Sequence, residues 1–334
     1  MKARSSEVEL LRIFSIVLIV VTHLVVWGIG HTDNALPWQS DLSDFINQLI
    51  RWHVNVFVII TGYFGIKSRW SVIKIAFVSI FYTWFTDILQ TIFFFEEFDP
   101  IDFLKSIFFI THNKYWFVQS YILLVLVSPL LNQLMKTNYI SLLLTLLFID
   151  CWCGFVHNEY ISNGFGIIHF STLYVLGGGD FYKELPMKIL YIILLTLVIL
   201  LAIYILYGKN VFSGSGYNNP ILIGIAMVIF RIFIKFKFQS AWINKLAISS
   251  FPVYLIHDSA FGHSIFKLIM TYYNDYISSH VLYITLLFMM GVMTFLIGFV
   301  MDMLLFRLYA PALLYIDNKF RKNPYLNYLR GNCL

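Results

Sequence analysis

The feature that most constrains this chain is a succession of long apolar runs that extends from one end of the sequence to the other. In the run LLRIFSIVLIVVTH, residues 10–23, one arginine and one histidine interrupt side chains that are otherwise nearly all hydrocarbon. A helix of about 20 apolar residues matches the thickness of a bilayer core. Of the 334 residues only 12% are charged, against about 25% in a typical soluble domain. The sequence therefore predicts an integral membrane protein, not a soluble domain with one anchor.

Windows of about 20 residues predict an all-α polytopic protein with about ten transmembrane helices in one domain, residues 1–334. The first run lacks a small-residue cleavage site, and we interpret it as a retained helix and not as a signal peptide. The short apolar segment 101–112 is expected to be an interfacial or re-entrant piece. The ten expected helices cover residues 8–30, 44–66, 71–95, 115–134, 139–157, 165–182, 187–208, 218–238, 246–268 and 281–307.

The basic residues alternate along the chain with the expected helices. Lysine and arginine precede the first helix and follow every second helix, whereas the intervening loops contain few of them and the loop 96–102 is acidic. By the positive-inside rule, both termini and the basic tail at about 316–334 are expected to be cytoplasmic. The formal net charge of +5 follows from this orientation and requires no nucleic-acid partner.

Arg12 and His23 are costly residues for an apolar helix, and their spacing is informative. The offset of eleven residues from Arg12 to His23, at about 100° for each step, corresponds to about three full turns, so both side chains lie on one face about 16 Å apart. Glu9, three residues before Arg12, is expected to pair with it. One interpretation is that Arg12 reaches the cytoplasmic headgroups and His23 makes a neutral interhelical hydrogen bond. The other is that both side chains face a functional cavity.

The expected helix 44–66 carries His53 and the small pair Thr61–Gly62, which favours a close helix approach. Lys67 and Arg69 follow it as a basic cluster. These two residues fit the positive-inside rule, and beside a cavity they also suit phosphate groups.

Polar residues also occur near the ends of two later helices. Tyr115 and Trp116 are typical of an interfacial aromatic belt, and Gln119 lies one turn deeper, where it requires a partner. Tyr254 and His257 share one stripe of the helix 246–268. Histidines on different helices, together with an arginine, indicate a polar cavity with a general base that is available near neutral pH.

The motifs of common soluble enzymes are absent. The sequence contains no P-loop, G-x-S-x-G elbow, H-E-x-x-H pair or dinucleotide fingerprint. Its three cysteines, Cys151, Cys153 and Cys333, lack zinc-site spacing. We therefore expect no metal and no bound cofactor.

Five segments, in this order, resemble the membrane-bound acyltransferase-3 family, whose members are ten-helix proteins that O-acylate polysaccharides and related glycans. The basic pair reads Lys-x-Arg here, which departs from the family's Arg-x-x-Arg. No SGNH-type domain follows the tenth expected helix, so the chain resembles a stand-alone acyltransferase unit. The segments are SSEVELLRIFSIVLIVVTH (5–23), VFVIITGYFGIKSRW (56–70), YWFVQSYILLVLVSPLLN (115–132), LYVLGGGDF (173–181) and SFPVYLIHDSAF (250–261).

The resemblance implies an O-acyltransferase, most simply an O-acetyltransferase, of the bacterial cytoplasmic membrane. Acyl-CoA from the cytoplasm is the expected co-substrate, and a hydroxyl of an exported or lipid-linked polysaccharide is the expected acceptor. Glycan-synthesis machinery is an expected partner. His23 either deprotonates the acceptor or carries the acyl group covalently, while His257 and Tyr254 orient the acceptor or stabilise the oxyanion. The expected site comprises catalytic His23, Glu9, His257 and Tyr254, donor-binding Arg12, Lys67 and Arg69, and acceptor-binding His53, Tyr115, Trp116 and Gln119.

A polar cavity with aromatic rims also suits other membrane functions. The main alternative is a polytopic exporter or flippase of a glycan or lipid-linked sugar, and a non-catalytic component of a glycan-synthesis complex is a third. Transfer of acyl groups from acyl-CoA by the purified protein discriminates an enzyme from both.

Overall fold

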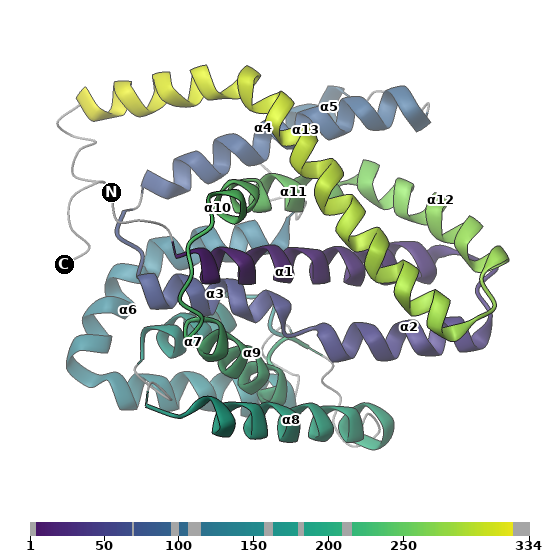
Figure 1. Ribbon diagram of the computed structural model, residues 1–334. Helices are drawn as coiled ribbons and strands as arrows, with labels where there is room; N and C mark the ends of the chain where they lie inside the picture. The colour runs from purple at the N-terminus through teal and green to yellow at the C-terminus, as the bar shows by residue number, and fades with distance from the viewer. Residues whose placement is uncertain are drawn as a thin grey trace.

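The fold is known from a computed structural model, and its described regular elements are all helices (Figure 1). The chain is thus an all-α polytopic membrane protein, as predicted. Ten spans and cytoplasmic termini stay predictions. The structure describes residues 5–68, 70–94, 100–105, 115–156, 163–179, 184–208 and 216–322. Five of its helical segments are long and apolar enough to cross a membrane, namely Ser6–His31, Trp70–Phe94, Trp116–Trp152, Met187–Tyr207 and His280–Lys319.

Helix α1 (Ser6–His23) lies in the middle of the bundle in Figure 1. It continues into a π-helical turn, η1 (Leu24–Gly28), and a 3-10 turn, η2 (Ile29–His31), so the predicted helix 8–30 is confirmed. Inside a membrane a helix satisfies its own backbone hydrogen bonds, which leaves the side chains to determine its packing. Helix α1 packs mainly against α3 (His53–Phe64), α9 (Pro220–Phe233), α10 (Ala241–Ile248), α11 (Ser250–His257) and α13 (His280–Lys322).

The prediction of one helix over 44–66 was wrong, because this region contains two helices that meet at Arg51–Trp52. The first, α2 (Pro37–Ile50), starts earlier than predicted, with Pro37 at a helix-initiating position and Gln39 accepting a hydrogen bond from the Leu36 amide at 2.8 Å. Helix α2 is amphipathic, with apolar residues on one face and polar residues on the other. A search for continuous apolar runs therefore does not detect where this helix begins.

Helices α3 and α7 (Ile167–Gly178) cross in backbone contact, as predicted from the Thr61–Gly62 pair. A Cβ atom placed on Gly62 would lie 2.1 Å from the carbonyl oxygen of Tyr174. A Cβ atom on Gly177 would likewise lie 2.2 Å from the carbonyl oxygen of Ile59. Glycine is required at both positions because any side chain would force the two helices apart.

The predicted helices 115–134 and 139–157 together form α6 (Trp116–Leu147) and the π-helical η4 (Phe148–Val156). A kink at Asn138, with φ −140° and ψ 48°, marks the predicted boundary between them. The predicted helix 246–268 is instead three helices, α10, α11 and α12 (Ala260–Tyr276). The last break follows Asp258, where the Ser259 hydroxyl accepts a hydrogen bond from the amide of Gly262 at 3.1 Å.

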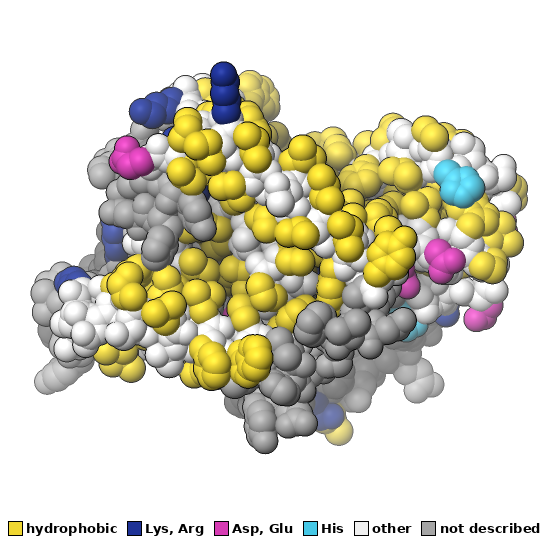
Figure 2. Space-filling view, turned by 90° about the horizontal axis from the view of Figure 1, so that it is seen from below, with side chains coloured by type: hydrophobic (Ala, Val, Ile, Leu, Met, Phe, Trp, Pro, Cys, Tyr) yellow, Lys and Arg dark blue, Asp and Glu magenta, His cyan; other side chains and the backbone are white. Residues whose placement is uncertain are grey.

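The remaining helices form the outer part of the bundle. They are α4 (Trp70–Phe94), α5 (Pro100–Lys105) and α8 (Met187–Ile203), which continues into η5 (Tyr204–Gly208). Helix α8 packs on α9 and exposes Ile192 and Leu195. Figure 2 shows hydrophobic side chains across the face on this side of the molecule, which is typical of a lipid-facing surface. The last helix, α13, runs to Lys322, well past the predicted end at 307.

Candidate active site

A cavity of about 350 Å³ lies beside α1, and both Arg12 and His23 line it. Ile16 and Ile19 line it between them, so one stripe of α1 forms a whole wall. These four positions are spaced by three or four residues, which is the repeat of a helix face. The structure therefore confirms that Arg12 and His23 share a face, and that this face is open to a common space.

The other walls of the cavity are mainly apolar and aromatic. Helix α3 contributes Phe57 and Thr61, and α11 contributes Tyr254. Trp116, at the start of α6, stacks on Tyr217 with ring centroids 5.5 Å apart and an interplanar angle of 25°. The cavity thus combines a polar group at each end of the α1 stripe with a flat aromatic wall.

At one end of the stripe, an ion pair fixes the Arg12 guanidinium. Its Nη1 atom lies 3.2 Å from Oε1 of Glu9, and the Arg12 side chain remains 32% exposed. The structure thus places Glu9 beside Arg12, one helical turn before it, in the predicted pair. A guanidinium has five N–H donors, so Arg12 retains donors for an anionic ligand.

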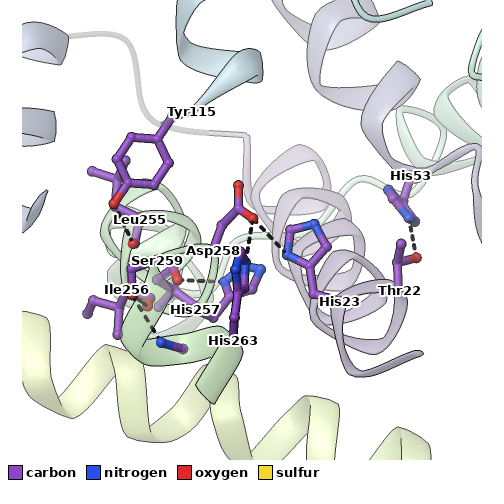
Figure 3. Close-up of polar contacts among 12 residues, drawn as sticks. Thr22, His23, His53, Tyr115, Leu255, Ile256, His257, Asp258, Ser259 and His263 are labelled. Atoms are coloured by element: carbon purple, nitrogen blue, oxygen red, sulfur yellow. Dashed lines mark hydrogen bonds and ion pairs between the residues drawn. The ribbon is translucent and has the colours of Figure 1, made fainter. Parts of the chain in front are cut away.

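At the other end, His23 belongs to a cluster around the carboxylate of Asp258 (Figure 3). His23 Nδ1 lies 3.4 Å from Asp258 Oδ1, at ion-pair distance and without an aligned hydrogen bond. His263 Nε2 donates to the same oxygen at 3.2 Å. Because His23 Nδ1 is buried against the carboxylate, Nε2 is the nitrogen left for the cavity. Hydrogen bonds in empty active sites often shorten once substrate is bound.

His257 and Tyr254 lie next to this cluster, on α11. The His257 ring centroid is 5.0 Å from that of His23, and His257 Nδ1 donates to the carbonyl oxygen of Val253 at 2.7 Å. A neutral His257 therefore has its lone pair on the buried Nε2. The structure thus brings His23, Tyr254 and His257 together, and their catalytic roles stay predictions.

The π-helical turn after His23 explains how His263 is held in place. It brings Trp27 under His263, with the two rings stacked at a centroid distance of 4.0 Å, while His31 stacks on Trp27 at 5.4 Å. Widened helical turns of this kind are frequent at functional sites. No role was predicted for Asp258 or His263. The available signal was the cost of an aspartate at membrane depth, directly after a histidine.

Of the four predicted acceptor-binding residues, Trp116 alone lines the cavity. Tyr115 is buried and its hydroxyl donates to the carbonyl oxygen of Leu255 at 3.1 Å. His53 has no exposed surface, and its Nε2 lies 2.8 Å from the Thr22 hydroxyl (Figure 3). Gln119 is half-buried. Tyr115 and His53 thus support neighbouring helical segments, and an acceptor role for any of the four stays a prediction.

Of the predicted basic cluster, Lys67 and Arg69, only Lys67 belongs to the described residues. Lys67 is exposed beyond the end of α3 and does not line the cavity. Arg69 lies outside the described residues. A phosphate-binding role for this pair stays a prediction. Within the described residues, no group of three or more His, Cys, Asp or Glu side chains is arranged to hold a metal ion.

Comparison with known protein families gives one match. A family model described as an acyltransferase domain matches residues 5–303, which include the whole cavity and the Asp258 cluster. No curated protein and no solved structure matches the chain.

Proposed function

Because the chain belongs to the acyltransferase-3 family, we propose that this membrane acyltransferase moves an acetyl group from acetyl-CoA to a hydroxyl of a polysaccharide or lipid-linked glycan. The observation that carries the proposal is the single cavity that Arg12 and His23 share. A bacterial cytoplasmic membrane, with both substrates reaching this cavity, is the setting that fits such a reaction.

The donor end of the cavity is assigned to Arg12. A guanidinium forms bidentate contacts with phosphate, and a permanently charged group is most stable where water reaches it. Arg12 is one-third exposed, whereas the stripe beyond it is apolar. Along the helix the two polar ends are separated by about 16 Å. A donor with a phosphate at one end of a flexible arm and a thioester at the other matches this arrangement.

The reacting end is assigned to His23. In the proposed mechanism the carboxylate of Asp258, 3.4 Å away, keeps the proton of His23 on Nδ1, so that Nε2 presents its lone pair to the cavity. The same logic governs histidine–aspartate pairs in hydrolases, where the aspartate stabilises the imidazolium that forms during the reaction. Tyr254, which lines the same cavity, supplies a hydroxyl donor toward the developing oxyanion.

The proposed reaction is a direct transfer. His23 Nε2 accepts the proton of the acceptor hydroxyl as its oxygen bonds to the thioester carbonyl carbon. When the tetrahedral intermediate collapses, the carbon–sulfur bond breaks and the same proton passes from His23 to the leaving thiolate. The products are the ester and free CoA thiol, with no net proton gained or lost.

The acceptor is assigned to the aromatic wall of Trp116 and Tyr217. Sugar rings present C–H faces that pack on flat aromatic rings, and the wall lies within the same cavity as His23. Association with glycan-synthesis machinery would supply such an acceptor close to the membrane.

The decisive experiment uses the purified full-length chain in detergent with acetyl-CoA and oligosaccharide acceptors, and follows acetyl ester formation and thiol release. We expect turnover in the natural protein and its loss in His23→Ala, with both proteins eluting identically on size exclusion. In cells, the surface glycan should lose its acetyl ester signals by NMR in His23→Ala. Undiminished ester content would refute the assignment, and glycan transport without consumption of acetyl-CoA would support the exporter alternative.

A further inference from the structure

A second buried polar network lies behind the aromatic wall, outside the residues assigned to the reaction. His169 on α7 has no exposed surface, and its Nδ1 lies 2.7 Å from Oδ2 of Asp150 in η4. Its Nε2 lies 3.0 Å from Oδ1 of Asn55 on α3. The amide of Asn55 in turn donates from Nδ2 to the main-chain carbonyl of Tyr217 at 2.9 Å. One chain of hydrogen bonds thus connects three helical segments to Tyr217.

Donor and acceptor chemistry fixes the direction of every bond in this chain. The Tyr217 carbonyl only accepts, so Asn55 must present Nδ2 to it and Oδ1 to His169. His169 Nε2 must therefore carry a proton, and one further proton lies between His169 Nδ1 and Asp150. The Asp150–His169 pair is consequently neutral as a unit, which makes its burial affordable. Changing any one member leaves a buried partner unsatisfied.

The segment that contains Tyr217 has a second hydrogen-bonded link to the network. Asn218 donates from its side-chain Nδ2 to the main-chain carbonyl of Asp150 at 3.0 Å, and the Tyr217 amide donates to the carbonyl of Asn163 at 3.0 Å. The irregular stretch just before α9 is therefore held at two consecutive residues. The ring of Tyr217 stacks on Trp116, and the two rings form the aromatic wall of the cavity.

We propose that Asn55, His169 and Asp150 are positioning residues that fix the main chain at Tyr217 and so hold the Trp116–Tyr217 wall in the geometry that binds the acceptor ring. None of the three lines the cavity, and they act on the substrate through Tyr217. The assignment of the wall to the acceptor rests on the function proposed above, whereas the control of Tyr217 by the network does not.

The test compares Asn55→Asp with Asn55→Ala in the purified full-length protein. Aspartate retains an acceptor for His169 but removes the donor to the Tyr217 carbonyl. If the network acts through Tyr217, both variants should raise the acceptor KM about tenfold and leave the KM for acetyl-CoA and kcat within about twofold. A near-natural acceptor KM in Asn55→Asp would overturn the proposal. Asp317→Ala is the control, since it removes a buried 2.7 Å hydrogen bond from Trp70 and neither residue lines the cavity.

A double-mutant cycle distinguishes a positioning role of Asn55 from a general loss of stability. The effects of Asn55→Ala and Tyr217→Ala on acceptor KM should be non-additive, because both variants disrupt the same wall. The effects of Asn55→Ala and Arg12→Lys should add. Additivity in both cycles would show that Asn55 acts by general destabilisation, and would overturn the proposal.

Hydrogen exchange separates this inference from the proposed function. Amides at 216–219 should exchange faster in both Asn55 variants than in the natural protein or in Asp317→Ala. Unchanged exchange there would refute the positioning role, whatever the activity. Faster exchange in a protein whose natural form lacks transferase activity would refute the proposed function and retain the network's control of Tyr217.

Discussion

His23 Nδ1 lies 3.4 Å from Oδ1 of Asp258, and these residues come from α1 and from the break that follows α11. The pair joins two segments that are more than 230 residues apart in the sequence. His263 donates to the same carboxylate oxygen and so helps to hold Asp258 in place. In the proposed mechanism, Asp258 selects which nitrogen of His23 faces the cavity.

Asp258→Asn should lower kcat for acetyl transfer by about 10²–10⁴-fold, because the imidazolium of His23 loses its stabilising charge. The KM for both substrates should change little, since Asp258 contacts neither of them in the proposed mechanism. Steady-state kinetics on the purified protein measure both parameters. Asp44→Asn, which changes an exposed carboxylate on α2, is the matched control. A kcat within twofold of the natural value would contradict the role of Asp258.

Arg12→Lys should raise the KM for acetyl-CoA about tenfold or more, because lysine cannot reproduce a bidentate phosphate contact. The same substitution should have no effect with S-acetylpantetheine, which has the thioester and lacks the phosphates. Parallel kinetics with the two donors measure this difference. An equal loss with both donors would mean that Arg12 acts on the structure of the site and not on the phosphates.

Incubation with radiolabelled acetyl-CoA in the absence of acceptor should leave no label on the denatured protein, because direct transfer requires the acceptor hydroxyl. The measurement is a rapid quench in cold sodium dodecyl sulfate at neutral pH, where an acyl-imidazole survives longer than in acid, followed by fast gel filtration, with His23→Ala as the control. Label that is retained by the natural protein and lost in His23→Ala would replace direct transfer by a covalent acyl-histidine intermediate.

Gly62→Ala should destabilise the protein by about 1–3 kcal/mol, because the added methyl would overlap the backbone of α7 at Tyr174. Thermal unfolding in detergent measures the change in stability. Gly30→Ala is the control, because a Cβ atom there lies 3.7 Å from its nearest neighbour, in ordinary contact. Equal stability of the two variants would show that α3 and α7 separate at little cost.

The helical, membrane-embedded fold follows from the sequence alone. Hydrocarbon runs of bilayer length leave the backbone no alternative to helix, so α4, and α1 together with its continuation through η1 and η2, begin and end close to their predicted limits. The helical repeat also places Arg12 and His23 on one face without any tertiary information. The glycine pairing of α3 with α7 was likewise predictable in part, because Thr61–Gly62 indicates close approach although it does not identify the partner helix.

The helix breaks and the partners of the buried charges were decided by tertiary structure. The hydropathy of an apolar run is the same whether the run forms one helix or several. Hydropathy therefore does not predict the breaks at Arg51–Trp52 and at Asp258–Ser259. The partner of His23 is equally hidden, because any carboxylate at the right depth would serve, and only the packing of α11 against α1 selects Asp258. Sequence periodicity defines the face that a residue occupies. What that face meets depends on contacts between distant segments, which no local pattern encodes.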